Sequence, residues 1–226
     1  MKSVVVENYI KAAFEIEREH GRVTTSQLAA RLGVTPASVT GMIKKLVELE
    51  LVSHVPYQGI ELTGKGTRSA LDILRRHRLL ELYLVKTLGL PWDEVHREAE
   101  NLEHAVSEEL TQRIDEYLGY PASDPHGSPI PGKNVSMENP DRVRLTELKT
   151  GDTAVIAEVE DHDAELLRHV GSMGLYPGAR IEVTATEQFD GLHTICIEGN
   201  TYVLGKNVSK RICVKNVTKQ KRRKAR

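Results

Sequence analysis

Histidine and glutamate residues recur at helical spacing in the middle of the chain. In the segment RRHRLLELYL, His77 and Glu81 stand four positions apart and therefore share one face of a predicted helix. The segment EVHREAENLEHAV continues the pattern and places four such residues on one face of a second helix: His96, Glu100, Glu103 and His104. Imidazole nitrogens and carboxylate oxygens are ligands for Mn, Fe, Co, Ni and Zn in proteins. The spacing therefore predicts a divalent-metal site built from two helices.

Two structural explanations compete with a metal site. A solvated helix face can carry these residues, and histidines can pair with neighbouring carboxylates without any ion. A solvated face would usually also contain Lys and Arg, however, and a face turned to the core would be apolar. Six His and Glu residues on two consecutive helices favour the metal site over both explanations.

The N-terminal part of the chain predicts a winged helix-turn-helix over residues 1–66. Apolar residues at helical spacing predict a helix over 3–20, a second over 26–32 and a third from Pro36 to about Glu50. Two short alternating runs follow and predict a hairpin. Helix, helix, turn, helix and hairpin, in this order, are typical of a DNA-binding winged module.

The third of these helices is the candidate DNA-reading element. Thr35 is its predicted N-cap, and small side chains near its start would allow close approach to base edges in the major groove. The residues predicted to contact DNA, with the lysines reaching phosphates, are Thr35, Pro36, Ala37, Ser38, Thr40, Lys44 and Lys45. The opposite face is predicted to pack inward through Val39, Met42, Ile43 and Leu46. A three-helix domain that binds protein instead of DNA is the alternative.

The rest of the chain divides by composition. Helical spacing over 67–120, interrupted once by Gly-Leu-Pro, predicts two helices, the second over about 92–118. A stretch rich in Pro, Gly and Ser over 121–142 predicts a linker. Short alternating runs, with one short helix among them, predict a small β-barrel over 143–218, and residues 219–226 form a basic tail. The predicted fold class is α+β.

The order of these motifs resembles a known family of regulators. A winged helix-turn-helix, HxxxE, HxxxExxEH, the linker segment DPHGSPIP and a small barrel together resemble the diphtheria-toxin-repressor family, in its manganese-transport-regulator branch. The resemblance covers almost the whole chain. It implies a transcriptional repressor of metal-homeostasis genes that binds double-stranded operator DNA as a homodimer once Mn(II), or alternatively Fe(II), is bound. It also implies two metal positions per subunit and a C-terminal barrel of the FeoA type, similar to Src-homology-3 domains.

Matching the motifs residue by residue implies a ligand set for each position. One position would use His77, Glu81 and His96, with Asp161 or alternatively Asp163 from the barrel. The other position would use Glu100, Glu103 and His104. The segment DPHG matches a linker segment that reaches the metal cluster in some members of the family, through Asp124 and His126. The dimer surface would come from apolar residues of the long helices, with core packing as the alternative: Leu79, Leu80, Leu82, Leu84, Val95 and Val106.

The first helix departs from the family pattern. Asn8 stands before Tyr9, where the family usually has Asp or Met as a ligand, and Asn8 offers only a neutral carbonyl oxygen. Lys11 stands where manganese regulators can carry a Glu, and a charged Lys cannot bind a metal. Glu100, in contrast, replaces a Cys of the iron-type branch, and a carboxylate at this position favours Mn(II).

Composition bounds the remaining properties. The 226 residues carry a formal net charge of -1 at pH 7, with an acidic middle between more basic ends. No apolar run approaches the length of a membrane helix, so we expect a cytoplasmic protein without a membrane partner. The two cysteines, Cys196 and Cys213, lie in alternating apolar stretches and are predicted to be buried free thiols.

Two other functions remain alternatives. A metalloenzyme could use the same ligands to activate water. The chain has no HExxH, nucleophile elbow or phosphate loop, however, so we expect no enzymatic activity and no organic substrate. A winged-helix repressor that senses a small organic ligand would need an apolar pocket where this chain has a polar helix face.

Overall fold

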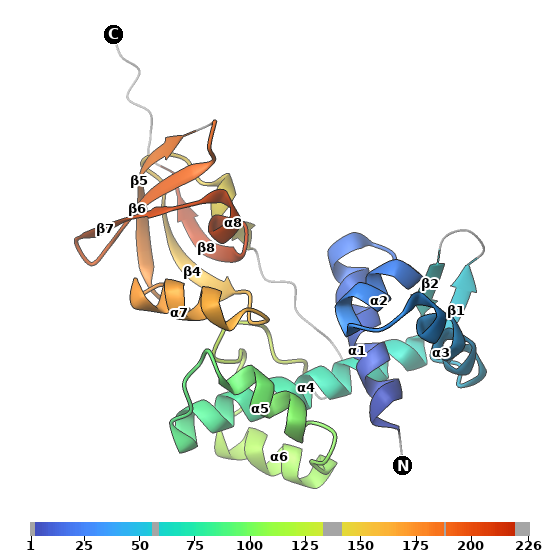
Figure 1. Cartoon of the computed structure of the whole chain (residues 1–226). Coiled ribbons are helices and arrows are strands. Elements are labelled where there is room, and N and C mark those ends of the chain that lie inside the picture. Colours follow the sequence, from blue (N-terminus) through green and yellow to red (C-terminus); the bar gives the residue numbers. More distant parts are fainter. Residues whose placement is uncertain (1–2, 56–58, 133–141, 188, 220–226) are drawn as a thin grey trace.

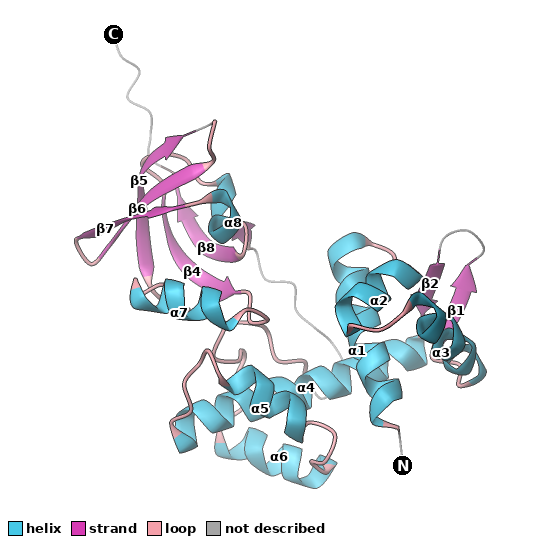
Figure 2. Ribbon diagram, viewed as in Figure 1, coloured by secondary structure: helices cyan, strands magenta, loops and turns pink. Residues whose placement is uncertain are grey.

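The structure, a computed structural model, describes residues 3–55, 59–132, 142–187 and 189–219. Three parts follow one another along the chain (Figure 1): helices with a hairpin, a middle group of helices, and a larger sheet. Figure 2 shows that the strands gather in two separate places, the hairpin and the C-terminal sheet. The predicted α+β class is confirmed. The predicted basic tail lies outside the described residues, apart from its first residue.

The N-terminal part is the predicted winged helix-turn-helix. Its helices are α1 (Val4–His20), α2 (Thr25–Leu32) and α3 (Pro36–Glu48), and its hairpin pairs β1 (Val52–Val55) with β2 (Gly59–Leu62). A capping box formed by Thr24 and Gln27 starts α2. Gly33 ends α2 with a φ of 65°, the left-handed conformation that glycine adopts without strain. Thr35 then caps α3, as predicted.

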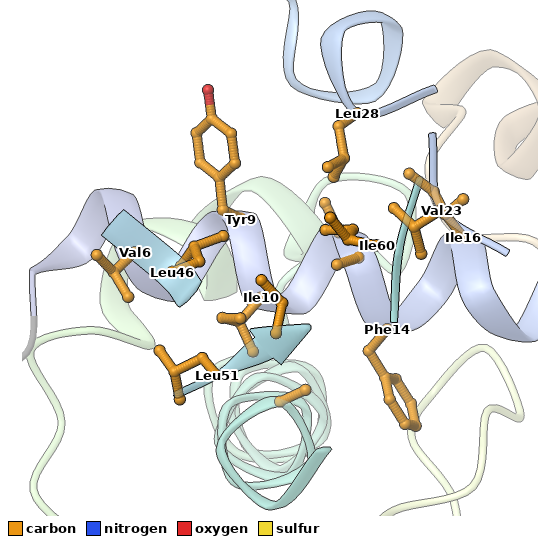
Figure 3. Close-up of a cluster of buried hydrophobic side chains, with 14 of the residues drawn as sticks. Val6, Tyr9, Ile10, Phe14, Ile16, Val23, Leu28, Leu46, Leu51 and Ile60 are labelled. Atoms are coloured by element: carbon orange, nitrogen blue, oxygen red, sulfur yellow. The ribbon is translucent and has the colours of Figure 1, made fainter. Parts of the chain in front are cut away.

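One core holds these helices and the hairpin together (Figure 3). Ile10, Leu28 and Leu46 are fully buried in this core, and Ile60 reaches it from the hairpin. Leu71 of α4 (Gly64–Leu88) belongs to the same core. Burying a side chain of this size contributes about 1.5–3 kcal/mol. The start of the long helix α4 is therefore fixed to the winged part, and the rest of α4 runs on into the middle of the molecule (Figure 1).

Two short helices pack against the second half of α4. They are α5 (Val95–Leu102) and α6 (Glu108–Tyr117), so the single helix predicted over 92–118 is wrong. The chain turns between them, and the Ser107 hydroxyl caps α6 by accepting a hydrogen bond from the Leu110 N–H. The core that α4, α5 and α6 share contains Leu79, Leu80, Ala99 and Ile114.

The apolar residues predicted to form a dimer surface lie inside the subunit. Five of them are buried, and the sixth is half-buried: Leu79, Leu80, Leu82, Leu84 and Val95, then Val106. The alternative of core packing therefore describes them better, because α5 packs against an apolar face of α4. The large apolar side chains that α5 and α6 leave exposed are Leu102, Leu110 and Tyr117.

The first part of the predicted linker is a packed segment. The Asp124 carboxylate accepts hydrogen bonds from the His126 and Ser128 N–H groups, which folds the chain into a tight turn. The His126 carbonyl accepts a hydrogen bond of 2.9 Å from the Val159 N–H, so the turn is bonded to the sheet. His126 itself is fully buried. Residues 133–141 of the predicted linker lie outside the described residues.

The C-terminal part is a six-stranded antiparallel sheet. Its strand order is β3 (Val143–Arg144), β8 (Ile212–Thr218), β4 (Thr153–Val159), β5 (Arg180–Glu187), β6 (Leu192–Ile197) and β7 (Asn200–Leu204). Three short helices accompany the strands: the 3-10 helix η1 (Leu145–Glu147), the predicted α7 (Ala164–Ser172), and α8 (Lys206–Ser209). The pairing of β4 with β8 shifts register between Ile156 and Glu158, and such a bulge bends a strand.

The two cysteines are free thiols but half-buried, so the prediction of burial is wrong. Strand alternation is the reason. Cys213 lies between the buried Ile212 and Val214 on β8, and its side chain therefore points to the other face of the sheet. None of the described helices is both long and apolar enough to cross a lipid bilayer.

Candidate metal centre and DNA-reading face

Helices α4 and α5 bring the first set of predicted ligands together. His77 and Glu81 lie one turn apart on α4, with His77 Nε2 3.0 Å from Glu81 Oε1. His96 at the start of α5 faces them, and its Nδ1 is 3.0 Å from both of these atoms. His77 is nearly, and Glu81 fully, buried. Such burial of polar groups costs free energy unless other groups form hydrogen bonds or ion pairs with them.

The turn over residues 124–128, which we term the packed turn, and the sheet complete this group from the other side. Asp161 follows β4, and its Oδ2 is 3.9 Å from His96 Nδ1. His126 places its Nδ1 3.8 Å from Glu81 Oε2. Four residues each contribute one ligand atom to a group in which all these atoms lie within 4.8 Å of one another: Glu81, Asp124, His126 and Asp161. We term these four residues the Glu81 cluster.

Two further groups overlap with the Glu81 cluster. One contains His77, Glu81 and His96, and the other contains His96, Asp161 and His162. His162 was not predicted, although it stands between Asp161 and Asp163 in the segment VEDHDAELL. Its Nδ1 lies 3.4 Å from His96 Nε2. The first predicted ligand set and the linker pair therefore meet in one place.

Three buried atoms of the Glu81 cluster have no hydrogen-bond partner: Glu81 Oε2, Asp124 Oδ2 and His126 Nδ1. Arg78 Nε lies 3.6 Å from Asp124 Oδ2, which is too far for a hydrogen bond. A buried polar atom without a partner costs about 1–3 kcal/mol. Because all three can offer a lone pair, a single divalent cation among them would satisfy them together. The residues of the cluster fit a metal ion.

The orientation of His126 is fixed by Trp92. The Nε2–H of His126 donates a hydrogen bond of 2.7 Å to the Trp92 carbonyl, and the two rings stack with centroids 5.6 Å apart. A histidine that donates through one nitrogen presents the other to a metal, which is the usual arrangement around bound ions. Trp92 directly follows the Gly-Leu-Pro segment that ends α4. This segment therefore also helps to position His126, a candidate ligand.

Electrostatics in the cluster reflect deep burial of opposite charges. Burial opposes the charge on Glu81, but the His77 imidazolium outweighs it and holds the pKa of this carboxyl well below its usual range. Burial also opposes charge on the imidazoles, yet Glu81 outweighs it and raises the pKa of His77 to about 10 and of His126 to about 9. Burial, with Glu81 nearby, raises the pKa of Asp124 to about 8.

The second set of predicted ligands contacts charged residues of α1, and its Glu103 also lies 2.6 Å from His77 Nδ1. Glu103 is buried against Lys11, whose Nζ lies 2.9 Å from Glu103 Oε2. His104 Nδ1 donates to Glu7 Oε2 at 2.7 Å. The other two predicted residues of this position, Glu100 and Asn8, are exposed. Among the described residues, none of the second set belongs to a group of metal-ligand atoms like the Glu81 cluster.

Asp163, the alternative barrel ligand, has a structural role. Its carboxylate caps α7 by accepting hydrogen bonds from the Glu165 and Leu166 N–H groups. Its other oxygen lies 2.6 Å from Arg211. Of the two barrel carboxylates that the sequence offered, the structure places Asp161 beside His96 and turns Asp163 away to the helix.

The α3 face predicted to read DNA is free of packing. All seven residues predicted to contact DNA are exposed: Thr35, Pro36, Ala37, Ser38, Thr40, Lys44 and Lys45. The opposite face packs inward as predicted, with Val39 and Leu46 fully buried and Met42 and Ile43 half-buried against the core. The exposed face presents small side chains at the helix start and two lysines about two turns later. This arrangement suits contact with a nucleic-acid groove.

A winged helix-turn-helix joined through one long helix to a buried His, Asp and Glu cluster defines the class of metal-responsive DNA-binding regulators. Comparison with known families is specific. The chain matches the iron dependent repressor N-terminal DNA binding domain over residues 1–60, the iron dependent repressor metal binding and dimerisation domain over 63–132, and the FeoA domain over 143–216. The chain belongs to the iron-dependent repressor family, as the resemblance to diphtheria-toxin repressors implied.

Individual relatives agree with this assignment. The iron-dependent repressor IdeR of Mycobacterium leprae (strain TN) is 33% identical, over 78% of this chain and 82% of the relative. A solved structure described as a manganese-dependent transcriptional repressor in complex with manganese is 40% identical, covers 92% of this chain and 98% of its own, and has a TM-score of 0.86. The structure of IdeR from T. acidophilum is 30% identical, covers 95% and 99% of the two chains, and has a TM-score of 0.77. These relatives are repressors, so the metalloenzyme alternative has no support.

Proposed function

We propose that this chain represses transcription by binding operator DNA as a homodimer when a divalent metal, Mn(II) or alternatively Fe(II), is bound. The observation that carries the proposal is the Glu81 cluster, with its three buried ligand atoms that lack hydrogen-bond partners. The family adds a DNA-binding domain and a domain for metal binding and dimerisation. A DNA-binding repressor acts where the chromosome is, which supports the cytoplasm as its location.

The donor atoms support Mn(II) as the first choice of metal. The Glu81 cluster offers carboxylate oxygens and one imidazole nitrogen, and none of the metal-ligand groups in the described residues includes a cysteine. Oxygen-rich sets without sulfur suit Mn(II), whereas thiolates would shift preference toward softer ions. Solved relatives include a manganese-dependent repressor and curated ones include iron-dependent repressors, so Fe(II) stays the alternative.

Metal would act through the helix that connects the parts. Glu81 lies on α4, whose first turns are packed into the winged core, while Asp124 and Asp161 come from the packed turn and the end of β4. A bound cation would supply the positive charge that holds these carboxylates together. Held together in this way, these residues would favour one spacing of the two α3 helices in a dimer, and only one spacing matches half-sites on a duplex. A hundredfold shift of this equilibrium requires about 2.7 kcal/mol.

Removing the charge of Glu81 tests the proposal. In Glu81→Gln, metal-dependent binding to a selected operator duplex should fall at least a hundredfold in a gel-shift titration with Mn(II), because the residue shared by two ligand groups is lost. The matched control is Glu61→Gln, the same change at an exposed residue of β2, which should bind as the wild type does. Circular dichroism would verify that both variants fold.

Two outcomes would contradict the proposed function. A folded Glu81→Gln variant that binds operator only after Mn(II) is added, with wild-type affinity, would show that the metal acts elsewhere. Wild-type protein that binds operator equally well with and without a chelator would favour a repressor that senses an organic ligand.

A further inference from the structure

Lys11 places a positive charge among the ligands implied for the second metal position. It lies on α1, and only 7% of it is exposed. Its Nζ is 2.9 Å and 3.2 Å from the two carboxylate oxygens of Glu103, and 3.2 Å from His77 Nδ1. Glu100 Oε1 lies 3.9 Å away. Lysine is rarely buried unless its charge is paired, and here the paired carboxylate belongs to Glu103, a residue that the helical motifs mark as a metal ligand.

The groups around Lys11 satisfy one another without an ion. Glu7 accepts a hydrogen bond from His104 and also lies 3.5 Å from Arg76 Nη2. Among the described residues, none of the buried side-chain atoms of this group lacks a hydrogen-bond partner. The Glu81 cluster differs in this respect, because three of its buried atoms have none. Of the two implied metal positions, the Glu81 cluster therefore still has buried ligand atoms without partners, whereas the described residues around Lys11 have none.

Space and access do not explain the difference. A cavity of about 780 Å³ lies beside this group, and its lining includes Asn8, Lys11, Glu100, Glu103 and His104. A metal ion could reach these side chains. What stands between their carboxylates is the Lys11 ammonium, which already supplies a positive charge at hydrogen-bond distance.

We propose that the Lys11 ammonium is the resident cation of the second position, so that the chain binds no metal ion there and takes its metal at the Glu81 cluster. This inference rests on the proposed function, and it replaces the expectation of two metal positions per subunit. Lys11 also joins two parts of the molecule, since it lies on α1 of the winged part while Glu103 ends α5. The ion pair therefore ties α1 to the metal-binding helices whether or not metal is present.

The test counts Mn(II) ions per subunit in the full chain by equilibrium dialysis and metal analysis. Glu100→Gln should leave the count and the affinity unchanged, because Glu100 is not a ligand while Lys11 is in place. Lys11→Glu should raise the count by one ion per subunit, since a cation is replaced by a further carboxylate. Adding Glu100→Gln to Lys11→Glu should weaken binding of that extra ion at least tenfold.

Lys65→Glu provides the matched control. Lys65 is exposed on α4, and its partners in the described part of the chain are Leu49 and Glu50, just after α3. The same change of charge there should therefore leave the Mn(II) count as in the wild type. Loss of an ion in Glu100→Gln, or an unchanged count in folded Lys11→Glu, would overturn the inference. If Lys11→Glu does not fold, Glu100→Gln still decides, because its exposed side chain is not needed for folding. A wild-type chain that binds no Mn(II) would overturn the proposed function and this inference with it.

Discussion

In the proposed metal centre, which comprises the Glu81 cluster and the adjoining group of His77, Glu81 and His96, protons and a metal ion would compete for the same atoms. With His77 at a pKa of about 10 and His126 at about 9, both imidazoles carry protons near neutral pH in the metal-free protein. Asp124, at about 8, is also protonated there. Metals bind the unprotonated form of each group, so binding must release protons. The competition arises because the buried Glu81 carboxylate stabilises a positive charge beside it, whether that charge is a protonated imidazole or a metal ion.

Mn(II) affinity should therefore rise with pH. Between pH 6 and pH 8 we expect a gain of about tenfold per pH unit for each proton released, and the gain should level off above about pH 9 to 10. Isothermal titration calorimetry in buffers of different ionisation enthalpy would give both the affinity and the proton count. An affinity that is flat across this range, with no proton release, would contradict the assignment of these residues as ligands.

The metal-free protein should respond to pH in the opposite direction. Each of the three groups has a folded-state pKa above its usual value, so the folded state holds more protons than the unfolded state. Stability then falls as pH rises. For His77 and His126 the contribution is complete below about pH 6.5 and is lost as pH rises toward 9 to 10. Thermal melts with a chelator present should show this loss, and saturating Mn(II) should reduce it.

At the scale of elements, sequence periodicity predicts those helix bounds and buried faces that depend on residues close together in the chain. The bounds of α1, α2, α3 and α4 follow from apolar spacing, capping residues and glycines, and the inward face of α3 was predicted residue by residue. The break between α5 and α6 is not predicted by spacing, because Ser107 is an N-cap inside a segment whose apolar spacing continues. The order in the linker segment was missed for a similar reason. Its Pro and Gly content suits a loop, but Asp124 folds it locally and β4 holds it in place.

The ligand sets show the same division. Residues of one helix face could be grouped from spacing alone, which brought His77 and Glu81 together. Spacing could not show that Lys11, 92 positions from Glu103, would pair with it, because that contact depends on how α1 packs across α4. For the same reason His162 gave no signal by itself. It became a candidate ligand only through its place beside Asp161 and its 3.4 Å distance from His96.

Helix α3 gives a prediction about how DNA is read. Lys44→Ala should weaken binding to the selected operator and to random duplex by a similar factor, about threefold to tenfold, and lower the salt dependence, because a phosphate contact carries no sequence information. Ser38→Ala should instead change the preference among operator variants by a few-fold. Fluorescence anisotropy with Mn(II) present would measure both. The control is Lys149→Ala, an exposed lysine between η1 and β4. Equal losses on specific and random DNA for both α3 variants would contradict these roles.

At the scale of the molecule, the Glu81 cluster is where three parts of the chain meet. The helical part contributes Glu81, the packed turn contributes Asp124 and His126, and the sheet contributes Asp161. A metal bound there therefore connects the FeoA-type sheet to α4, while Lys11 connects α4 and α5 to the winged part without metal. In the proposed function the sheet would thus be part of the metal centre, and its docking should control affinity for the ion.

Gly127 tests that docking because the turn lies directly against β4 there. Its φ is 92°, and a Cβ on this residue would lie 2.0 Å from the Ala157 carbonyl oxygen, so Gly127→Ala must push the turn off the strand. We expect Mn(II) affinity to fall at least tenfold, since Asp124 and His126 move with the turn. Gly119→Ala is the matched control, because Gly119 has a similar φ of 75° but no atom within 4 Å of the added Cβ. Both variants carry backbone strain of about 1–2 kcal/mol, and only the clash differs. Equal Mn(II) affinities for the two variants would mean that the ion is held by the helices alone.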